Sequence, residues 1–243
     1  MAPPTGPKRL VSIDLSGPLP GNIMMIPSRN EEIGGYNYTI QHSRRHTHII
    51  GHISDRGQFL VPGDPTAVSR YLYVLTTSDG SKVVRVMTRT RVSNVFYLRR
   101  IQEFIKKVDD AMYHVLVREP IVMNVLEQTE DQNIEIELIP DNPIEEGDLD
   151  PSRPIPTYYR IKPAMKFYRT IGVVKYGRHT VDDKIEGLIE RRVIWGGAIG
   201  NPKITVTSNY TNGTEVVEKY EFLKNEQMFH AFSYKKRYSS LCG

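Results

Sequence analysis

The chain has 243 residues, a net charge of +4 from 32 basic and 28 acidic side chains, and a single cysteine, Cys242. One cysteine excludes an intramolecular disulfide framework, and the near balance of charges excludes a strongly basic nucleic-acid arm. No apolar run reaches the length of a membrane span, and residues 1–9 lead into no signal-peptide core. We therefore expect one large, soluble, intracellular domain over residues 1–243 that is not secreted.

The first third of the chain is predicted to be rich in strands. Prolines at positions 3, 4 and 7 favour an extended N-terminal arm over residues 1–8. Apolar and polar residues then alternate in short runs separated by turns, which is typical of strands. The predicted strands cover residues 9–15, 22–26, 36–42, 46–54 and 58–61.

The middle of the chain predicts a hairpin followed by a long helix. Alternating residues over 71–89 surround Asp79-Gly80, a pair that favours a tight hairpin turn because the turn requires positive φ. Directly afterwards Ser93 or Asn94 can cap a helix. Its apolar stripe would consist of Leu98, Ile101, Phe104, Ile105, Val108 and Met112. Strands are expected again over residues 121–127 and 133–139.

The last third predicts a loop, further strands and a second helix. Residues 140–156 hold five prolines among acidic residues, which indicates a surface loop or arm. After strands at 158–161 and 167–175, Thr180 and Asp183 have the spacing of a capping box. Ile185, Leu188, Ile189 and Val193 follow at helical spacing before Gly196-Gly197. Residues 204–222 are predicted to form a hairpin with its turn at residues 211–213.

These elements together predict an α+β fold. We expect a β-rich single domain of antiparallel, sandwich-like sheets, with a long middle helix, a C-terminal helix and extended arms. Trp195 would lie where the C-terminal helix meets a strand, as part of the core.

Catalytic motifs are mostly absent, so we expect no enzyme, no catalytic residue and no cofactor. The sequence has no Gly-rich phosphate loop, no nucleophile elbow and no CxxC. Four even-numbered histidines would share one face of an uninterrupted strand and are weak metal candidates: His42, His46, His48 and His52. Asp14 resembles the first carboxylate of a nuclease sheet, although no partner carboxylate stands at a comparable strand end.

Basic and aromatic residues suggest contacts with other molecules instead. The chain has 14 tyrosines and 7 phenylalanines, and tyrosine suits partly wet interfaces. A basic stripe that includes Arg85, Arg89 and Arg91, with Tyr97, also has the chemistry to contact phosphates. The candidate assembly contacts are Arg99, Arg100, Arg191, Arg192, Tyr210, Tyr234 and Tyr238.

Parts of the chain resemble insect-virus polyhedrins. Residues 185–207, reading IEGLIERRVIWGGAIGNPKITVT, are similar to the C-terminal helix and strand of baculovirus polyhedrin and granulin. Val83-Val84, Phe96-Tyr97 and residues 121–126 fit the middle of that family. Residues 71–89 with their SDGS turn, and the segment after them, resemble a hairpin and helix of cypovirus polyhedrins.

The resemblance implies an occlusion-body protein that forms trimers and an intracellular crystal around virions. Such bodies would lie in the cytoplasm of the infected host cell if the chain is cypovirus-like, and in the nucleus if it is baculovirus-like. The family dissolves at alkaline pH, and ionising all 14 tyrosines near pH 10 would change the net charge from +4 to −10. The alternatives are a viral matrix or nucleic-acid-binding protein and, third, a metal-dependent nuclease that uses Asp14 and the histidines.

Overall fold

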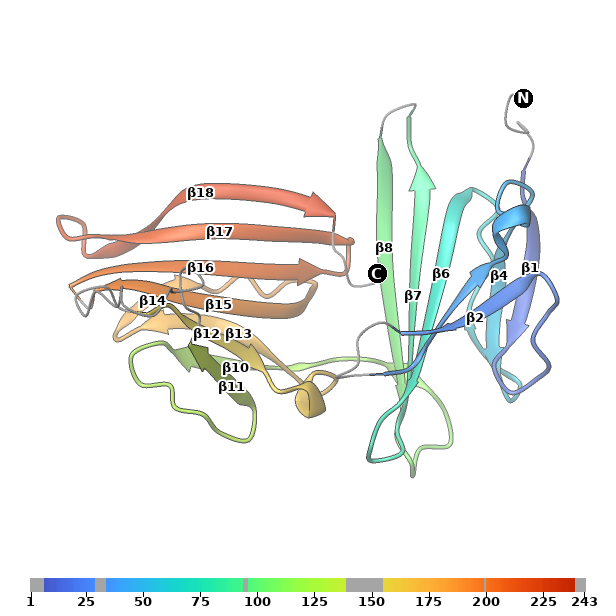
Figure 1. Ribbon diagram of the computed structural model, residues 1–243, viewed down its shortest axis with the longest axis horizontal. Coiled ribbons are helices and arrows are strands. Elements are labelled where there is room, and N and C mark those ends of the chain that lie inside the picture. Colours follow the sequence, from blue (N-terminus) through green and yellow to red (C-terminus); the bar gives the residue numbers. More distant parts are fainter. Residues whose placement is uncertain (1–6, 29–33, 94–95, 139–154, 199, 239–243) are drawn as a thin grey trace, which may run out of the picture. The chain divides into compact units, whose positions relative to one another are not determined.

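The computed structural model describes residues 7–28, 34–93, 96–138, 155–198 and 200–238 (Figure 1). Strands make up 62% of the described residues and helical residues 3%. Within the described ranges the helical segments are two single turns of 3₁₀ helix, η1 (His42–Arg44) and η2 (Pro163–Met165). The predicted α+β fold with a long middle helix and a C-terminal helix is therefore wrong, since the described residues are almost entirely β.

The chain divides after Leu116 into two compact units, where the sequence had predicted a single domain. We call the described residues up to Leu116 unit 1 and those from Val117 to Tyr238 unit 2. The boundary does not coincide with the Pro-rich segment 140–156, most of which lies outside the described residues. Most of the predicted arm, residues 1–8, also lies outside them.

Unit 1 is a sandwich of a three-stranded and a six-stranded sheet. The small sheet has the order β1-β4-β5, with β1 parallel to β4, and the large sheet has the order β2-β3-β6-β7-β8-β9. Ile13, Ile50 and Ile53 of the small sheet pack against Leu72 and Val86 of the large one. The strands are β1 (Arg9–Asp14), β2 (Ile23–Pro27), β3 (Tyr36–Ile40), β4 (His48–Asp55), β5 (Gln58–Val61), β6 (Ala67–Thr76), β7 (Lys82–Arg91), β8 (Tyr97–Lys106) and β9 (His114–Val115).

Unit 2 repeats this plan. Its small sheet has the order β10-β13-β14, with β10 parallel to β13, and its large sheet has the order β11-β12-β15-β16-β17-β18. Met123 and Ile171 of the small sheet pack with Tyr159, Val193 and Val206 of the large one. The strands are β10 (Glu119–Asn124), β11 (Ile134–Leu138), β12 (Thr157–Ile161), β13 (Arg169–Tyr176), β14 (His179–Asp182), β15 (Leu188–Ala198), β16 (Asn201–Tyr210), β17 (Thr214–Leu223) and β18 (Met228–Tyr238).

The two units correspond strand for strand, which indicates an internal structural repeat. Position by position, β1 to β9 match β10 to β18 in chain order and in sheet order, and the 3₁₀ turn falls between the third and fourth strands of each unit. The side chains of the two units differ at most matching positions, so the repeat is visible in the topology and was missed in the sequence.

A buried arginine joins the two sheets at the same place in each unit. In unit 1 the Nε of Arg70 donates to Thr88 Oγ1 at 3.2 Å, and its Nη1 donates to the carbonyl of Gly51. In unit 2 the Nε of Arg191 donates to Ser208 Oγ at 2.9 Å, and its Nη1 donates to the carbonyl of Gly172. Each arginine therefore connects the large sheet to the fourth strand of its own unit.

Each of these glycines lies at an irregularity of the parallel strand pair. The register shifts where β4 passes β1 next to Gly51, and again where β13 passes β10 at Gly172. A Cβ on Gly172 would stand 2.5 Å from Pro120 Cβ, so glycine is required for the close approach. A residue in a β-bulge does not take part in the regular hydrogen bonding between strands. The carbonyl of each glycine accepts a hydrogen bond from the arginine instead.

Most of the segment predicted as the middle helix forms strand β8. The prediction failed because a buried charged residue interrupts the alternation of apolar and polar side chains along this strand. Ile101, Glu103 and Ile105 are the buried positions, and Glu103 forms an ion pair with Arg85 of β7. The two isoleucines are four residues apart, which also fits a helix. Because the position between them is an acidic residue, the sequence does not show an apolar residue at every second position, which is the pattern that predicts a strand.

The predicted C-terminal helix is a turn followed by strand β15 for the same reason. Ile189, Arg191 and Val193 are buried in alternation, with the charged residue again in the middle. Ile185, which the helix would have buried, is exposed. Trp195 does pack against the unit 2 core, as predicted.

Candidate functional sites

The four histidines do not form a metal site. His42 lies in η1, and His46 lies in the turn before β4. His48 and His52 are in β4, where His52 Nδ1 and Ser12 Oγ are 2.7 Å apart. Within the described part of the chain no group of three or more His, Cys, Asp or Glu side chains is placed to hold a metal ion.

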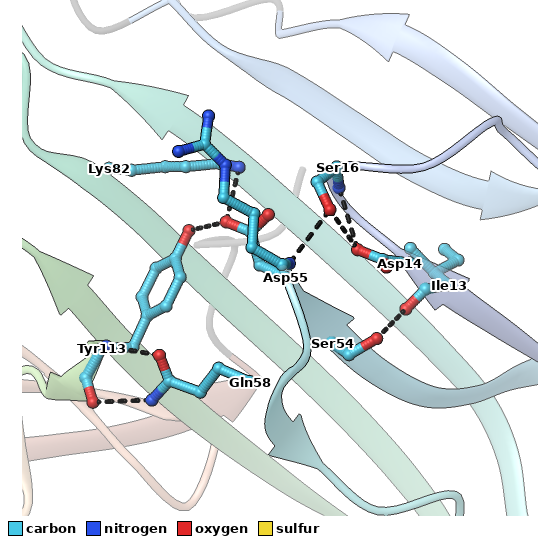
Figure 2. Close-up of polar contacts among 9 residues, drawn as sticks. Ile13, Asp14, Ser16, Ser54, Asp55, Gln58, Lys82 and Tyr113 are labelled. Carbon is cyan, nitrogen blue, oxygen red and sulfur yellow. Dashed lines mark hydrogen bonds and ion pairs between the residues drawn. The ribbon is translucent and has the colours of Figure 1, made fainter. Parts of the chain in front are cut away.

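Asp14 supports a turn instead of standing in a carboxylate cluster. Its Oδ1 accepts hydrogen bonds from the amide and hydroxyl of Ser16, and Ser16 Oγ accepts one from the amide of Arg56 (Figure 2). The hydrogen bond from the Ser16 side chain is the main cause that lowers the pKa of Asp14. These contacts tie the end of β1 to the β4–β5 turn.

Asp55, Lys82 and Tyr113 form a polar network in unit 1 around a buried carboxylate. Asp55, 5% exposed, accepts a hydrogen bond from the Tyr113 hydroxyl at 2.6 Å and pairs with Lys82 Nζ at 2.8 Å. Gln58 exchanges two hydrogen bonds with the backbone of Tyr113. Figure 2 shows the tyrosine ring directed toward the carboxylate.

This network is suited to holding the segment after β8 against the β4–β5 hairpin. Burial, and then the hydrogen bond to Asp55, raise the pKa of Tyr113, so the hydroxyl keeps its proton and is no general base near neutral pH. Unit 2 has a related pair, in which the Tyr220 hydroxyl donates to the buried Asp182 at 2.7 Å. A tyrosine–aspartate contact in both units favours a structural role.

Some of the arginines in the basic stripe of β7 and β8 bind other side chains of the protein itself. Arg85 is buried and paired with Glu103 at 2.9 Å, so it is withdrawn from any phosphate surface. Arg89 stacks over the ring of Tyr97 with 3.9 Å between its Cζ and the ring centroid. Of the two predicted contacts here, Arg100 is exposed and Arg99 half-buried.

In unit 2 the predicted contact residues separate into an inside and an outside group. Arg191 is 0% exposed and pairs with Asp182, so it cannot contact another molecule in this fold. Arg192 is half-buried and lies 3.5 Å from Glu215, and Tyr210 is also half-buried. Tyr234 and Tyr238 are exposed on β18.

Strand β18 is largely exposed to solvent. It lies at one margin of the large sheet of unit 2 and pairs only with β17 among the described strands (Figure 1). A register shift near Phe232 divides it, and residues 234–238 beyond the shift are all exposed. The matching strand of unit 1, β9, has only two residues. The sequence had indicated two candidate contact residues here, Tyr234 and Tyr238, and the strand that carries them was missed.

Strand β11 forms the other margin of the same sheet. It pairs with β12, and Glu135 and Glu137 of β11 both bind Arg160 of β12 at 2.9 Å. Leu138 at its end is 66% exposed. The alternation IEIEL had correctly predicted a strand, but its position at a sheet edge depends on topology and was not foreseen.

Comparison of the chain with protein families, curated proteins and solved structures gave no match. No helix among the described residues is long and apolar enough to cross a membrane. The segments whose likeness to polyhedrin helices formed part of the resemblance are strands in this fold.

Proposed function

We propose that the chain is a structural protein that assembles with copies of itself through the open edge of unit 2. The observation that carries the proposal is the exposed stretch 234–238 of β18, which pairs with β17 and with no other described strand and carries two exposed tyrosines. A strand at the edge of a sheet can bind another strand through backbone hydrogen bonds. Folded proteins usually shorten or cover such edges, as unit 1 does with β9.

An occlusion-body lattice is the specific form of assembly that the polyhedrin resemblance implies. In this form the protein would enclose virions in a crystal within the infected cell and dissolve at alkaline pH. Self-association through a strand edge is compatible with such a lattice and needs no catalytic residue or cofactor.

Dissolution of the lattice at alkaline pH would depend on the ionisation of fewer tyrosines than the 14 counted in the sequence. Burial is the first cause that raises the pKa in seven of the 14: Tyr38, Tyr73, Tyr113, Tyr158, Tyr159, Tyr176 and Tyr220. These seven stay protonated to higher pH than free tyrosine. The folded protein therefore gains less negative charge near pH 10 than full ionisation would give.

Sedimentation velocity of the purified full chain tests self-assembly. We expect species larger than the monomer whose share grows with concentration at neutral pH. In insect cells we expect refractile particles that persist at pH 7 and dissolve at about pH 10.5, near the tyrosine and lysine pKa values. A chain that stays monomeric at all concentrations and shifts labelled RNA would overturn the proposal in favour of nucleic-acid binding.

A further inference from the structure

The two edges of the large sheet in unit 2 carry opposite charges on the same face. We call the face toward the small sheet the inner face and the opposite one the outer face. Strand pairing and alternation place Glu135 and Glu137 of β11 on the outer face, opposite Arg160 and Tyr158. Strand pairing also places Val217 and Glu215 of β17 on the outer face, and Lys235 and Arg237 of β18 pair with these two residues. Lys235 and Arg237 therefore lie on the outer face.

The two edge segments match residue by residue when they are aligned antiparallel. Residues 134–138 read IEIEL, and residues 234–238 read YKKRY. One register pairs both glutamates with basic residues and both ends with tyrosines. The pairs are Ile134–Tyr238, Glu135–Arg237, Ile136–Lys236, Glu137–Lys235 and Leu138–Tyr234.

Exposure supports this register. Leu138 and Tyr234 are 66% and 61% exposed, although both are largely apolar, and the register places them opposite each other. Both lie on the inner face of their strands, so their contact would extend the core side of the sheet. Aromatic–aliphatic and opposite-charge neighbours are the pairs that stabilise adjacent strands.

Strand direction allows the same junction. All neighbouring strands of the six-stranded sheet are antiparallel, so its first and last strands run in opposite directions. When one sheet is placed beside another in the same orientation, β18 of the first therefore meets β11 of the second antiparallel. The pattern of the sheet continues across the junction.

We propose that β18 of one copy pairs with β11 of the next copy, with residues 234–238 against residues 134–138. The inference rests on the self-assembly proposed above and specifies its contact. On the outer face, charges of alternating sign would then follow one another across the junction from Arg160 through Glu135 and Arg237 to Glu215. A contact between two different edges is head-to-tail, so copies add in series, as a ring where the rotation between copies closes and as an open filament where it does not.

Charge reversal tests the pairing. One variant, Lys235→Glu with Arg237→Glu, makes both edges acidic, and a second, Glu135→Lys with Glu137→Lys, makes both edges basic. We expect each variant alone to have an apparent dissociation constant raised by about tenfold or more, because like charges meet at every junction. A 1:1 mixture should assemble again, because each acidic edge then finds a basic one.

A matched control reverses two lysines on the outer face away from both edges. Lys203→Glu with Lys219→Glu changes the charge by the same amount at exposed positions of β16 and β17. We expect it to leave assembly within about twofold of the wild type at 0.15 M salt, where distant exposed charges are screened. Circular dichroism and melting of each variant show that the monomers remain folded.

Crosslinking tests the register without relying on charge. In a Cys242→Ser background, Leu138→Cys combined with Tyr234→Cys should give a ladder of oligomers with a short bismaleimide linker. Either cysteine alone should give monomer. Dimers formed by Tyr234→Cys alone would show that β18 pairs with β18, by a two-fold contact.

The outcomes separate the two proposals. If the wild type assembles but the Glu135→Lys, Glu137→Lys variant assembles equally well, the β11 contact is wrong while self-assembly stands. Folded variants that stay monomeric after mixing would also overturn the β11–β18 pairing. A monomeric wild type would overturn both proposals.

Discussion

Arg191 and Asp182 form an ion pair of 2.8 Å in which both side chains are fully excluded from solvent. The same guanidinium also donates to Ser208, to the carbonyl of Gly172 and to the carbonyl of Lys184 at 2.7 Å. A buried charge with this many partners is costly to disrupt, since removal of one side leaves the other unpaired.

Replacement of this arginine should destabilise unit 2 strongly. We expect Arg191→Ala to lower the free energy of unfolding by about 3–5 kcal/mol, because Asp182 would be left as an unpaired buried carboxylate. Urea denaturation measures the change. Arg192→Ala is the neighbouring control, and because Arg192 is partly exposed we expect a loss of about 1 kcal/mol or less. Equal losses in the two variants would contradict the role given to Arg191.

The buried tyrosines should make stability depend on pH in the alkaline range. The pKa of Tyr220 is raised in the folded state by burial and then by its bond to Asp182, so the folded state holds this proton more tightly than the unfolded state. That contribution is fully present below about pH 10 and declines as pH rises above it. Tyr220→Phe should cost about 1–3 kcal/mol at pH 7 through the lost hydrogen bond.

The difference between wild type and Tyr220→Phe should then narrow above about pH 10, because phenylalanine does not titrate. Chemical denaturation at pH 7, 9, 10 and 11 provides the measurement. A gap that stays constant through this range would mean that the Tyr220 proton does not contribute.

The close approach at Gly172 should not tolerate a side chain. In Gly172→Ala the new Cβ would stand 2.5 Å from Pro120 Cβ and 3.3 Å from its Cα, so β10 or β13 has to move. We expect a loss of about 1–3 kcal/mol, typical of overpacking. Gly200→Ala serves as the control, because a Cβ there meets nothing within 4 Å and the glycine is exposed. Equal melting temperatures for the two variants would exclude the proposed clash.

Each half of the chain should fold by itself. Residues 1–116 and 117–243 each contain a complete pair of sheets with its own core. Expressed separately, both should show a β-type circular dichroism spectrum and a cooperative thermal transition. A half that is unfolded alone but folded in the full chain would show that the two units depend on each other.

Local patterns predicted the strands well where turns and alternation agree. Asp79-Gly80 identified the β6–β7 hairpin, and residues 211–213 identified the β16–β17 turn, because glycine with positive φ is needed at both. Residues 58–61 were also correctly predicted as a strand.

Long-range partners explain what the sequence could not reveal. Glu103 and Arg191 look like surface residues until their partners, Arg85 and Asp182, are known from the fold. The position of β11 and β18 at opposite margins of one sheet likewise depends on the order of the strands between them. Contacts between residues far apart in the sequence therefore explain the two wrongly predicted helices. They also create the candidate assembly edges, which short stretches of sequence cannot reveal.

The shortness of β9 limits how many neighbours each copy can hold. Unit 1 ends its large sheet with two residues at one margin, and β2 at the other margin ends in Pro27, which lacks an amide hydrogen. In unit 2 the margin strands β11 and β18 are longer than β9, and each pairs with a single neighbour among the described strands. Through the large-sheet margins of unit 2 alone each molecule is therefore bivalent and adds to its neighbours without branching, so any three-dimensional order has to come from other contacts between those assemblies.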